Sequence, residues 1–446
     1  MTGTSPAGRR RARGSPDNEP RDRRRPTSIS AAPGRARYHR VLALPHAKPF
    51  IAAATLAKLA VGINSLGILL FIRHETGSFA IAGAVNGAFA LGVGVGAPLL
   101  GRLVDRVGQR RVLLPAALFH TVSVLALVVL TQNRSAPAAL AAAALAGGAT
   151  LPPVSSVSRS VWRSAISSDT TLLTTAYAVD AISSEVGFTA GPAITAICVM
   201  LGSPTAAIVA SVSATVGGSL WFSVSPLAAA HELAAAHELA AAHDPQHTRG
   251  GGVLGPLASP GVRLLFLGAS AVGIAAGSVD VAVADFARQQ GSPGAAGLLI
   301  AMLGVGSLMG GLAYGAFSRR ENPARHYVVL MLILPVTFAP LLLGGSIALL
   351  AVVIVPAGIV IAPLVTAETA IINKSALVGT QTEAYTWMVT ATVVGASIGS
   401  AVAGVIAQSG GWRLAVGLSC ADAAAGSMLV LFGRHALPQT EASGMV

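Results

Sequence analysis

The chain has 446 residues, of which 53% are hydrophobic and only 11% are charged. A soluble protein of this length carries about a quarter charged residues, so the composition excludes an ordinary soluble enzyme or binding protein. Fifty glycines among long Leu, Ala and Val runs instead favour a polytopic helical membrane protein. Cys198 and Cys420 both fall within apolar runs, where we expect free thiols packed as small apolar side chains.

Residues 1–48 are rich in Arg, Pro, Ser and Gly and show no apolar periodicity. This composition predicts a disordered basic tail, which we expect to lie in the cytoplasm against anionic lipid headgroups. A twin-arginine export signal and nucleic-acid binding are less favoured, because the first apolar run starts only near Phe50. A start codon assigned too far upstream is the remaining alternative for this segment.

Apolar runs of about 20 residues, the length that crosses a bilayer, follow one another after Lys48. They predict twelve spans, with residues 49–226 forming a first six-helix bundle and residues 262–433 a second. The expected spans are 50–72, 78–100, 112–131, 136–157, 172–200, 204–226, 262–287, 294–317, 326–344, 346–369, 383–408 and 411–433. The sequence therefore predicts an all-α membrane protein with twelve transmembrane helices.

The basic residues of the loops predict the orientation, because cytoplasmic loops retain Lys and Arg. With both termini in the cytoplasm, including the tail at 434–446, the outer loops carry only Arg73, Arg134, Arg288 and Arg413. The inner side carries Arg102, Arg106, Arg110, Arg111, Arg159, Arg163, Arg249, Arg263, Arg319, Arg320, Arg325, Lys374 and Arg434. This asymmetry favours a multi-pass protein of the plasma membrane with both termini inside.

The long inner loop at 227–261 contains a tandem repeat in which His231-Glu232-Leu233 is followed by His237-Glu238-Leu239. Its histidines invite a metal site. On a helix, however, a spacing of six residues rotates successive side chains by about 600°, so they do not share a face. We expect a low-complexity cytoplasmic linker with no metal and no cofactor.

A basic loop lies between the second and third spans, where the chain reads Gly101-Arg102-Leu103-Val104-Asp105-Arg106-Val107-Gly108-Gln109-Arg110-Arg111. Glycines at both ends allow a tight turn. The pattern closely resembles the signature loop between helices two and three of the major facilitator superfamily of secondary transporters. The resemblance implies two pseudo-symmetric six-helix bundles. It also implies a cytoplasmic gate at Gly101, Asp105, Arg106, Gly108, Arg110, Arg111 and Glu383.

In the family, the acid of the signature loop faces the start of the eleventh helix when the protein is closed inside. The resemblance therefore implies that Asp105 lies at the helix start near Thr382, where the positive end of a helix attracts negative charge. Glu383 would bring a second acid to the same place. We expect Arg106 or Arg110 to lie between the two carboxylates.

The two halves of the chain resemble each other. A shift of 208 residues superposes Tyr177 on Tyr385, Gly187 on Gly395 and Gly191 on Gly399. The segment from Gly315 to Arg320 also looks like a degraded copy of the signature loop, with Arg319 in place of its acid. Such repeats are typical of secondary transporters.

The fifth span contains Gly187-Phe188-Thr189-Ala190-Gly191-Pro192. The two glycines allow close approach of a neighbouring helix, and Pro192 favours a bend. The Gly-Pro pair resembles the fifth-helix motif of the superfamily's antiporter branch, although Ile194 and Thr195 stand where further glycines are usual. The resemblance implies drug efflux by proton antiport. We assign Gly187, Gly191 and Pro192 to the substrate cavity.

Three acids in the spans are candidates for proton coupling, because a carboxyl in the bilayer needs a cavity or a partner. Glu185 is the first candidate, and Asp180 and Asp280 are the others. Pairing with a cation and contact with substrate are alternative roles for Glu185. Lys58 and Asn64 of the first span are candidates for the cavity lining, and Lys58 is alternatively paired with a carboxylate or extended to the cytoplasmic surface.

These features predict a secondary transporter that works by alternating access, with a small-molecule substrate, protons as the coupling ion, the bilayer as its surroundings and a monomeric state. We expect efflux of small hydrophobic or amphipathic compounds. Uptake of a sugar or another polar nutrient is the alternative, and a receptor or scaffold is the alternative of another class. No nucleophile elbow, phosphate-binding loop or metal-ligand spacing favours an enzyme, and nucleic acid is not an expected partner.

Overall fold

The computed structural model describes residues 34–166, 169–201, 203–241, 255–292, 295–317, 322–376 and 380–438. Within these ranges it contains twelve helices that are long and apolar enough to cross a membrane. This count confirms the predicted fold class. Arg319 and Arg320 of the second copy of the signature loop, and His243 and His247 of the central loop, lie outside the described residues.

The first six spans are formed by α2 (Ala47–Thr76), α3 (Phe79–Val107), α4 (Gln109–Gln132), α5 (Pro137–Ala149) with α6 (Val154–Ala165), α7 (Thr170–Met200) and α8 (Pro204–Val224). Side-chain caps satisfy the first amides of several helices. The Ser78 hydroxyl accepts from the Ile81 amide at the start of α3, and Asp169 accepts from Thr171 and Leu172 at the start of α7. Pro152 and Pro153 separate α5 from α6.

The second six spans are formed by α10 (Pro260–Gln289), α11 (Ala295–Phe317), α12 (Pro323–Phe338) with the short η2 (Ala339–Leu343), α13 (Ile347–Gly358) with α14 (Ile361–Ser375), and α15 (Gln381–Gly433). The last of these helices holds two spans. It reverses direction at Gly411, whose φ of 74° suits a residue without a Cβ. A short turn, η3 (Arg434–Ala436), follows it.

Two helices lie where the sequence predicted irregular chain. Residues expected to be disordered include α1 (Gly34–Leu42), and the expected linker includes α9 (Pro226–Ala241) before η1 (Gly255–Ala258). In α9 the Ala-rich repeat is a good helix former, and the Gln109 amide donates to its Ala228 carbonyl over 2.5 Å. Tertiary contacts of this kind stabilise helices too short to persist alone.

The glycine contacts show the repeat between the two bundles. In the first bundle Gly187 and Gly191 of α7 touch the backbone of Lys58 and Gly62 in α2, so a Cβ would collide there. In the second bundle Gly395 and Gly399 of α15 touch the backbone of α10 in the same way. The glycines of α3 and α5 are likewise matched by those of α11 and α13. Close backbone approach through small residues is thus common to both halves.

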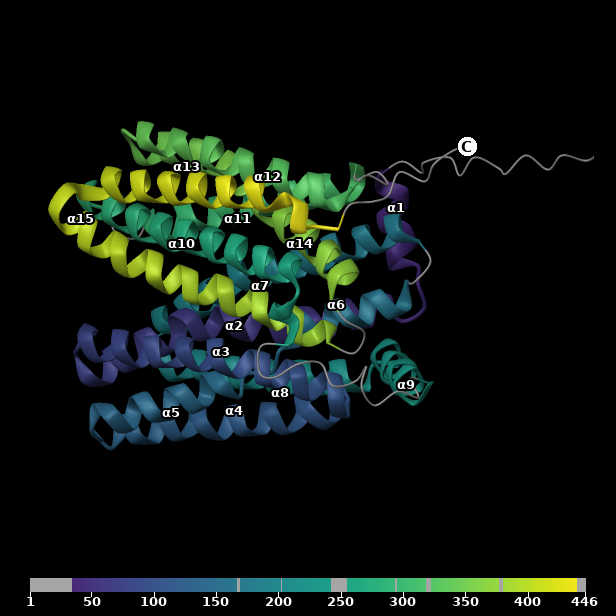
Figure 1. Ribbon diagram of the computed structural model, residues 1–446. Coiled ribbons are helices and arrows are strands. Elements are labelled where there is room, and N and C mark those ends of the chain that lie inside the picture. The colour runs from purple at the N-terminus through teal and green to yellow at the C-terminus, as the bar shows by residue number, and fades with distance from the viewer. Residues whose placement is uncertain are drawn as a thin grey trace, which may run out of the picture.

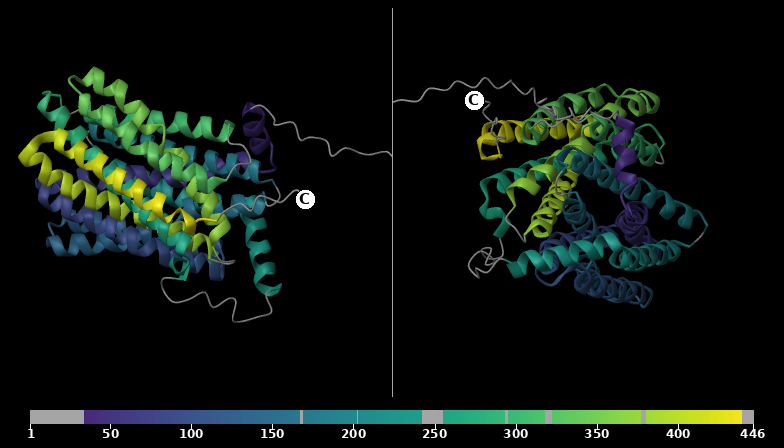
Figure 2. Two further views of the ribbon diagram at one scale, coloured as in Figure 1. Left: turned by 45° about the horizontal axis from the view of Figure 1, so that its top comes forward. Right: turned by 90° about the vertical axis from the view of Figure 1, so that its right-hand side faces the viewer.

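Figure 1 shows α2, α3, α4, α5 and α8 in the lower part of the molecule and α10, α11, α12 and α13 in the upper part. Both α1 and α9 lie at the right-hand end, together with α6, and Figure 2 places α1 and α9 at that end again. The turn between α3 and α4 at Gly108, with Arg106 at the end of α3 and Arg110 at the start of α4, also lies there, since α9 contacts Gly108. We call this the basic end of the molecule.

Candidate functional site

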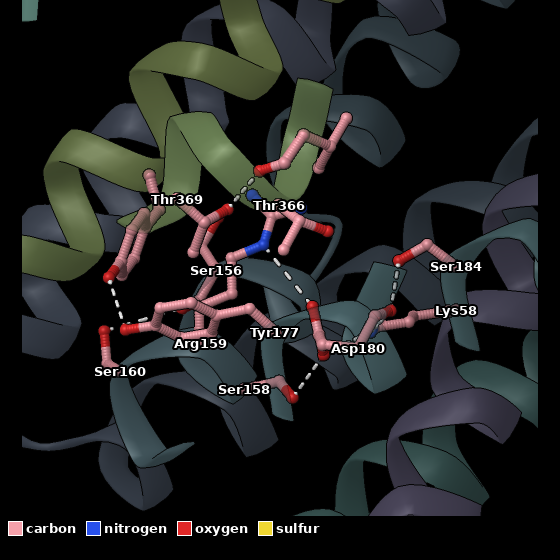
Figure 3. Close-up of polar contacts among 12 residues, drawn as sticks. Lys58, Ser156, Ser158, Arg159, Ser160, Tyr177, Asp180, Ser184, Thr366 and Thr369 are labelled. Atoms are coloured by element: carbon pink, nitrogen blue, oxygen red, sulfur yellow. Dashed lines mark hydrogen bonds and ion pairs between the residues drawn. The ribbon is translucent and has the colours of Figure 1, made fainter. Parts of the chain in front are cut away.

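A buried network of charges lies in the first bundle, where α2, α6 and α7 meet. The Lys58 ammonium is 2.5 Å from one carboxylate oxygen of Asp180 and donates to the Asp180 backbone carbonyl over 3.1 Å. The Ser158 hydroxyl donates to the same carboxylate oxygen over 2.6 Å, and Arg159 Nε lies 3.4 Å from the other. Figure 3 shows the side chains of Lys58, Ser158 and Arg159 converging on Asp180.

The sequence left open whether Lys58 lines the cavity, pairs with a carboxylate or extends to the cytoplasmic surface. Its side chain is only 3% exposed and that of Asp180 only 2%, so Lys58 does not extend to the surface. Charges removed from water this completely need a partner and further hydrogen bonds. Asp180 has both. The structure therefore places Lys58 and Asp180 in one ion pair, and Arg159 is a third member that the sequence did not indicate.

Glu185 lies apart from this network. It is half-buried on α7, and its carboxyl lies near Ser307 of α11 in the second bundle. Asp280 of α10 is exposed, and neither carboxyl forms an ion pair with a described residue. The three acids predicted to carry protons thus occupy three different environments, and only Asp180 is neutralised by cations.

The remaining residues assigned to the cavity have packing roles in this structure. Asn64 is fully buried, and its amide oxygen accepts from the Ser211 hydroxyl of α8 over 2.6 Å. Gly187 and Gly191 face the backbone of α2, and their assignment to the substrate cavity stays a prediction. Pro192 is half-exposed inside the continuous helix α7. The sequence could not separate packing from cavity lining, because both use small residues.

The two bundles meet at the basic end through Asp105. One of its carboxylate oxygens accepts from the Thr382 amide over 3.2 Å, and the other accepts from the Glu383 amide over 2.9 Å. These are the first free amides of α15, where a helix favours negative charge. Asp105 therefore caps a helix of the opposite bundle, as the resemblance implied.

The arginine that pairs with Glu383 is Arg102. Two nitrogens of its guanidinium donate to the Glu383 carboxylate, Nε over 3.1 Å and Nη2 over 2.5 Å. Arg106 and Arg110, expected in this role, are exposed. Arg111 is exposed as well. Position 102 lies three residues before Asp105, about one turn back on α3, so both side chains reach the same helix start.

Small residues let these helices come close. A Cβ at Gly101 would collide with the Thr386 side chain, and Gly108 has a φ of 91° at the turn into α4. Further contacts between the bundles join Ser160 to Thr382 over 2.9 Å and the hydroxyl groups of Tyr177 and Tyr385 over 3.4 Å. The two tyrosines are the pair superposed by the repeat, so equivalent residues of the two halves contact each other.

The arrangement resembles known transporters in both sequence and structure. A family model described as Major Facilitator Superfamily matches residues 50–264 and 265–444. No curated protein sequence matches significantly. The human organic anion transporter MFSD10 (TETRAN) is a structural neighbour with a TM-score of 0.65 and 15% identity, over 86% of this chain and 99% of that one.

A second structural neighbour is a bacterial homologue of the iron transporter ferroportin in an outward-facing state. Its TM-score is 0.68 and its identity 12%, over 87% of this chain and 99% of that one. At such identities the neighbours show the fold, while the family model covers nearly all the spans. The chain belongs to the major facilitator superfamily and is a membrane transporter, not an enzyme.

Proposed function

We propose that the protein exports small hydrophobic or amphipathic compounds in exchange for protons, as a monomer in the plasma membrane with its basic end in the cytoplasm. The observation that carries the proposal is the position of Glu185. This carboxyl lies half-buried in the fifth span, faces α11 of the opposite bundle near Ser307, and has no ion-pair partner among the described residues.

A carboxyl in this position can link proton binding to bundle movement. Its charged form is costly in a closed contact between two helices and becomes less costly when the helices separate and water enters. Proton loss therefore favours separation of α7 from α11, and proton binding favours their contact. Asp180 is less suited to this role, because Lys58 and Arg159 already neutralise it.

The test measures substrate-driven proton flux in acid-loaded liposomes that contain the purified protein. Lipophilic cations, neutral antibiotics and organic anions are added one at a time, the last because the human neighbour transports them. We expect a lipophilic compound to trigger proton release and Glu185→Gln to reduce that release to the level of empty vesicles. The matched control is Glu75→Gln, which makes the same exchange at the exposed end of α2 and retains the flux.

Substrate-driven flux that persists in Glu185→Gln would remove Glu185 from the coupling step and leave Asp280 as the next candidate. Substrate movement without proton movement would contradict antiport. Flux driven only by organic anions would contradict the proposed substrate class.

A further inference from the structure

The short helix α1 contacts both bundles at the basic end. From α1, the Tyr38 hydroxyl lies 2.9 Å from the Leu312 carbonyl and 3.2 Å from the Gly311 carbonyl of α11, in the second bundle. Two residues further on, Arg40 binds the carboxylate of Asp169 over 3.0 Å. Asp169 caps α7 of the first bundle. One turn of α1 thus connects the start of α7 with α11. Figure 1 shows α1 at the right-hand end of the molecule.

The α7–α11 contact is tight where Tyr38 inserts. A Cβ at Gly315 would collide with the Tyr38 hydroxyl and lie against the Ala178 side chain of α7. The Thr175 hydroxyl of α7 donates to the Gly315 carbonyl over 3.1 Å beside it. Burial raises the pKa of Tyr38 to about 12, so the phenol stays a neutral donor. The Tyr38 ring thus occupies space that is open only because residue 315 is a glycine.

In the repeat, the contact between α3 and α15 is the counterpart of the α7–α11 contact. Different groups hold it together. There the acid Asp105 of α3 caps α15. On the α7–α11 side the equivalent acid is absent from the sequence, because Arg319 stands in its place, and α7 is capped by its own Asp169 instead. Within the described part of the chain, the α7–α11 contact therefore has no helix-capping link between the bundles, and α1 supplies a link from outside the repeat.

We propose that α1 is a conformational restraint, which keeps the basic end closed through Tyr38 and Arg40 and has to leave α11 before that end opens. Alternating access requires α7 and α11 to separate at the basic end. Among the described residues, the phenol bonds to α11 and the guanidinium bonds to Asp169 at the start of α7, so separation must break at least one of the two links. The restraint acts on the equilibrium between closed and open states and requires neither a particular substrate nor a coupling ion.

The test measures the labelling rate of a buried thiol at the α7–α11 contact. In a background with Cys198→Ser and Cys420→Ser, Thr175→Cys places a thiol where the native side chain is 1% exposed. N-ethylmaleimide then reacts only when the contact opens. Because the rate is proportional to the open fraction, it reports rare opening as well as frequent opening. A second thiol, from Ser211→Cys inside the α2–α8 contact, reports general loosening.

We expect Tyr38→Phe and Arg40→Gln each to raise the labelling rate at position 175 by about two- to tenfold, the range that the loss of one or two hydrogen bonds predicts. The rate at position 211 should not change. His39→Gln, an exposed substitution on the same helix, is the matched control and should alter neither rate.

Unchanged labelling at position 175 in the Tyr38→Phe, Arg40→Gln double variant would overturn the restraint. An equal rise at positions 175 and 211 would also overturn it, because α1 would then stabilise the whole fold and not one contact. Both readouts are made without substrate and without a proton gradient, so failure of proton-coupled efflux leaves them unaffected.

Discussion

Asp180 shows at the scale of single residues why a buried charge must be considered with its partners. Lys58 and Arg159 lie on different helices from Asp180, and all three side chains are more than 90% buried. The sequence indicated Lys58 and Asp180 as isolated polar groups of separate spans. Pairing of Lys58 with a carboxylate was one of three alternatives and its partner was not named, because the distance between two helices cannot be derived from the position of a residue along each.

We expect Asp180→Asn to lower the free energy of unfolding by about 3–5 kcal/mol, since it leaves two buried cations without their anion. Lys58→Met should cost less, because Arg159 still pairs with Asp180. In the double variant the two effects should not add, as is usual for residues in direct contact. Thermal unfolding in detergent measures all three variants, and strictly additive losses would contradict a shared network.

Among the packed helices, glycine contacts set the distance between α2 and α7. Gly191 lies against the backbone of Gly62, whereas Gly217 of α8 has no atom within 4 Å of the position of a Cβ. The sequence revealed that small residues recur in the fifth span, but not which helix they face. Alanine substitutions at these two glycines distinguish the effect of packing on stability from the effect of helix propensity.

We expect Gly191→Ala to destabilise the protein by about 1–3 kcal/mol, because a Cβ in a filled contact forces the backbones apart. Gly217→Ala should stabilise it by up to about 1 kcal/mol, because alanine favours the helix and meets nothing. Unfolding temperatures of the two variants would decide the matter, and a destabilised Gly217→Ala would contradict this account of α8.

The docking of α9 depends on His231, which lies outside the spans. Its Nδ1 is 2.9 Å from the Ser164 hydroxyl of α6. Burial, and secondarily the charge of Arg163, lowers the pKa of His231 from 6.5 to about 4. The docked form thus holds fewer protons than the undocked form between these values. Docking should therefore be strongest above pH 6.5 and weaken as the pH falls toward 4.

Hydrogen exchange of the α9 amides checks this expectation, with protection that falls between pH 6.5 and 4 after correction for the intrinsic rates. The variant His231→Gln keeps a polar side chain that does not titrate. Its α9 should lose the pH dependence in this window. If protection in the variant falls just as steeply, another group controls α9.

At the scale of the whole molecule, the number of spans and the capping of α15 by Asp105 could be predicted, and the partners of the charges could not. Hydropathy identifies a span because the bilayer has a fixed thickness. Arg102, unlike Arg106, binds Glu383 because the end of α3 turns one face toward α15. Helix α1 was missed because contacts with helices distant in the sequence stabilise it, and its own composition does not.

Asp105 should control how readily the two bundles part. We expect Asp105→Asn to weaken the closed basic end by about 1–2 kcal/mol, because one acceptor is lost together with the charge at the start of α15. The same thiol at position 175 should then react about five- to thirtyfold faster. Arg106→Gln, an exposed neighbour at the end of α3, is the control, and equal rates for the two variants would contradict a specific role for Asp105.

The contact between Tyr38 and Gly311 joins residues separated by 273 positions in the chain. During synthesis α1 leaves the ribosome long before α11 has been made, so its docking site does not yet exist. Ordering of α1 must therefore await the second half of the protein. Protection of Tyr38 from solvent during translation would consequently mark the moment when the two halves have come together.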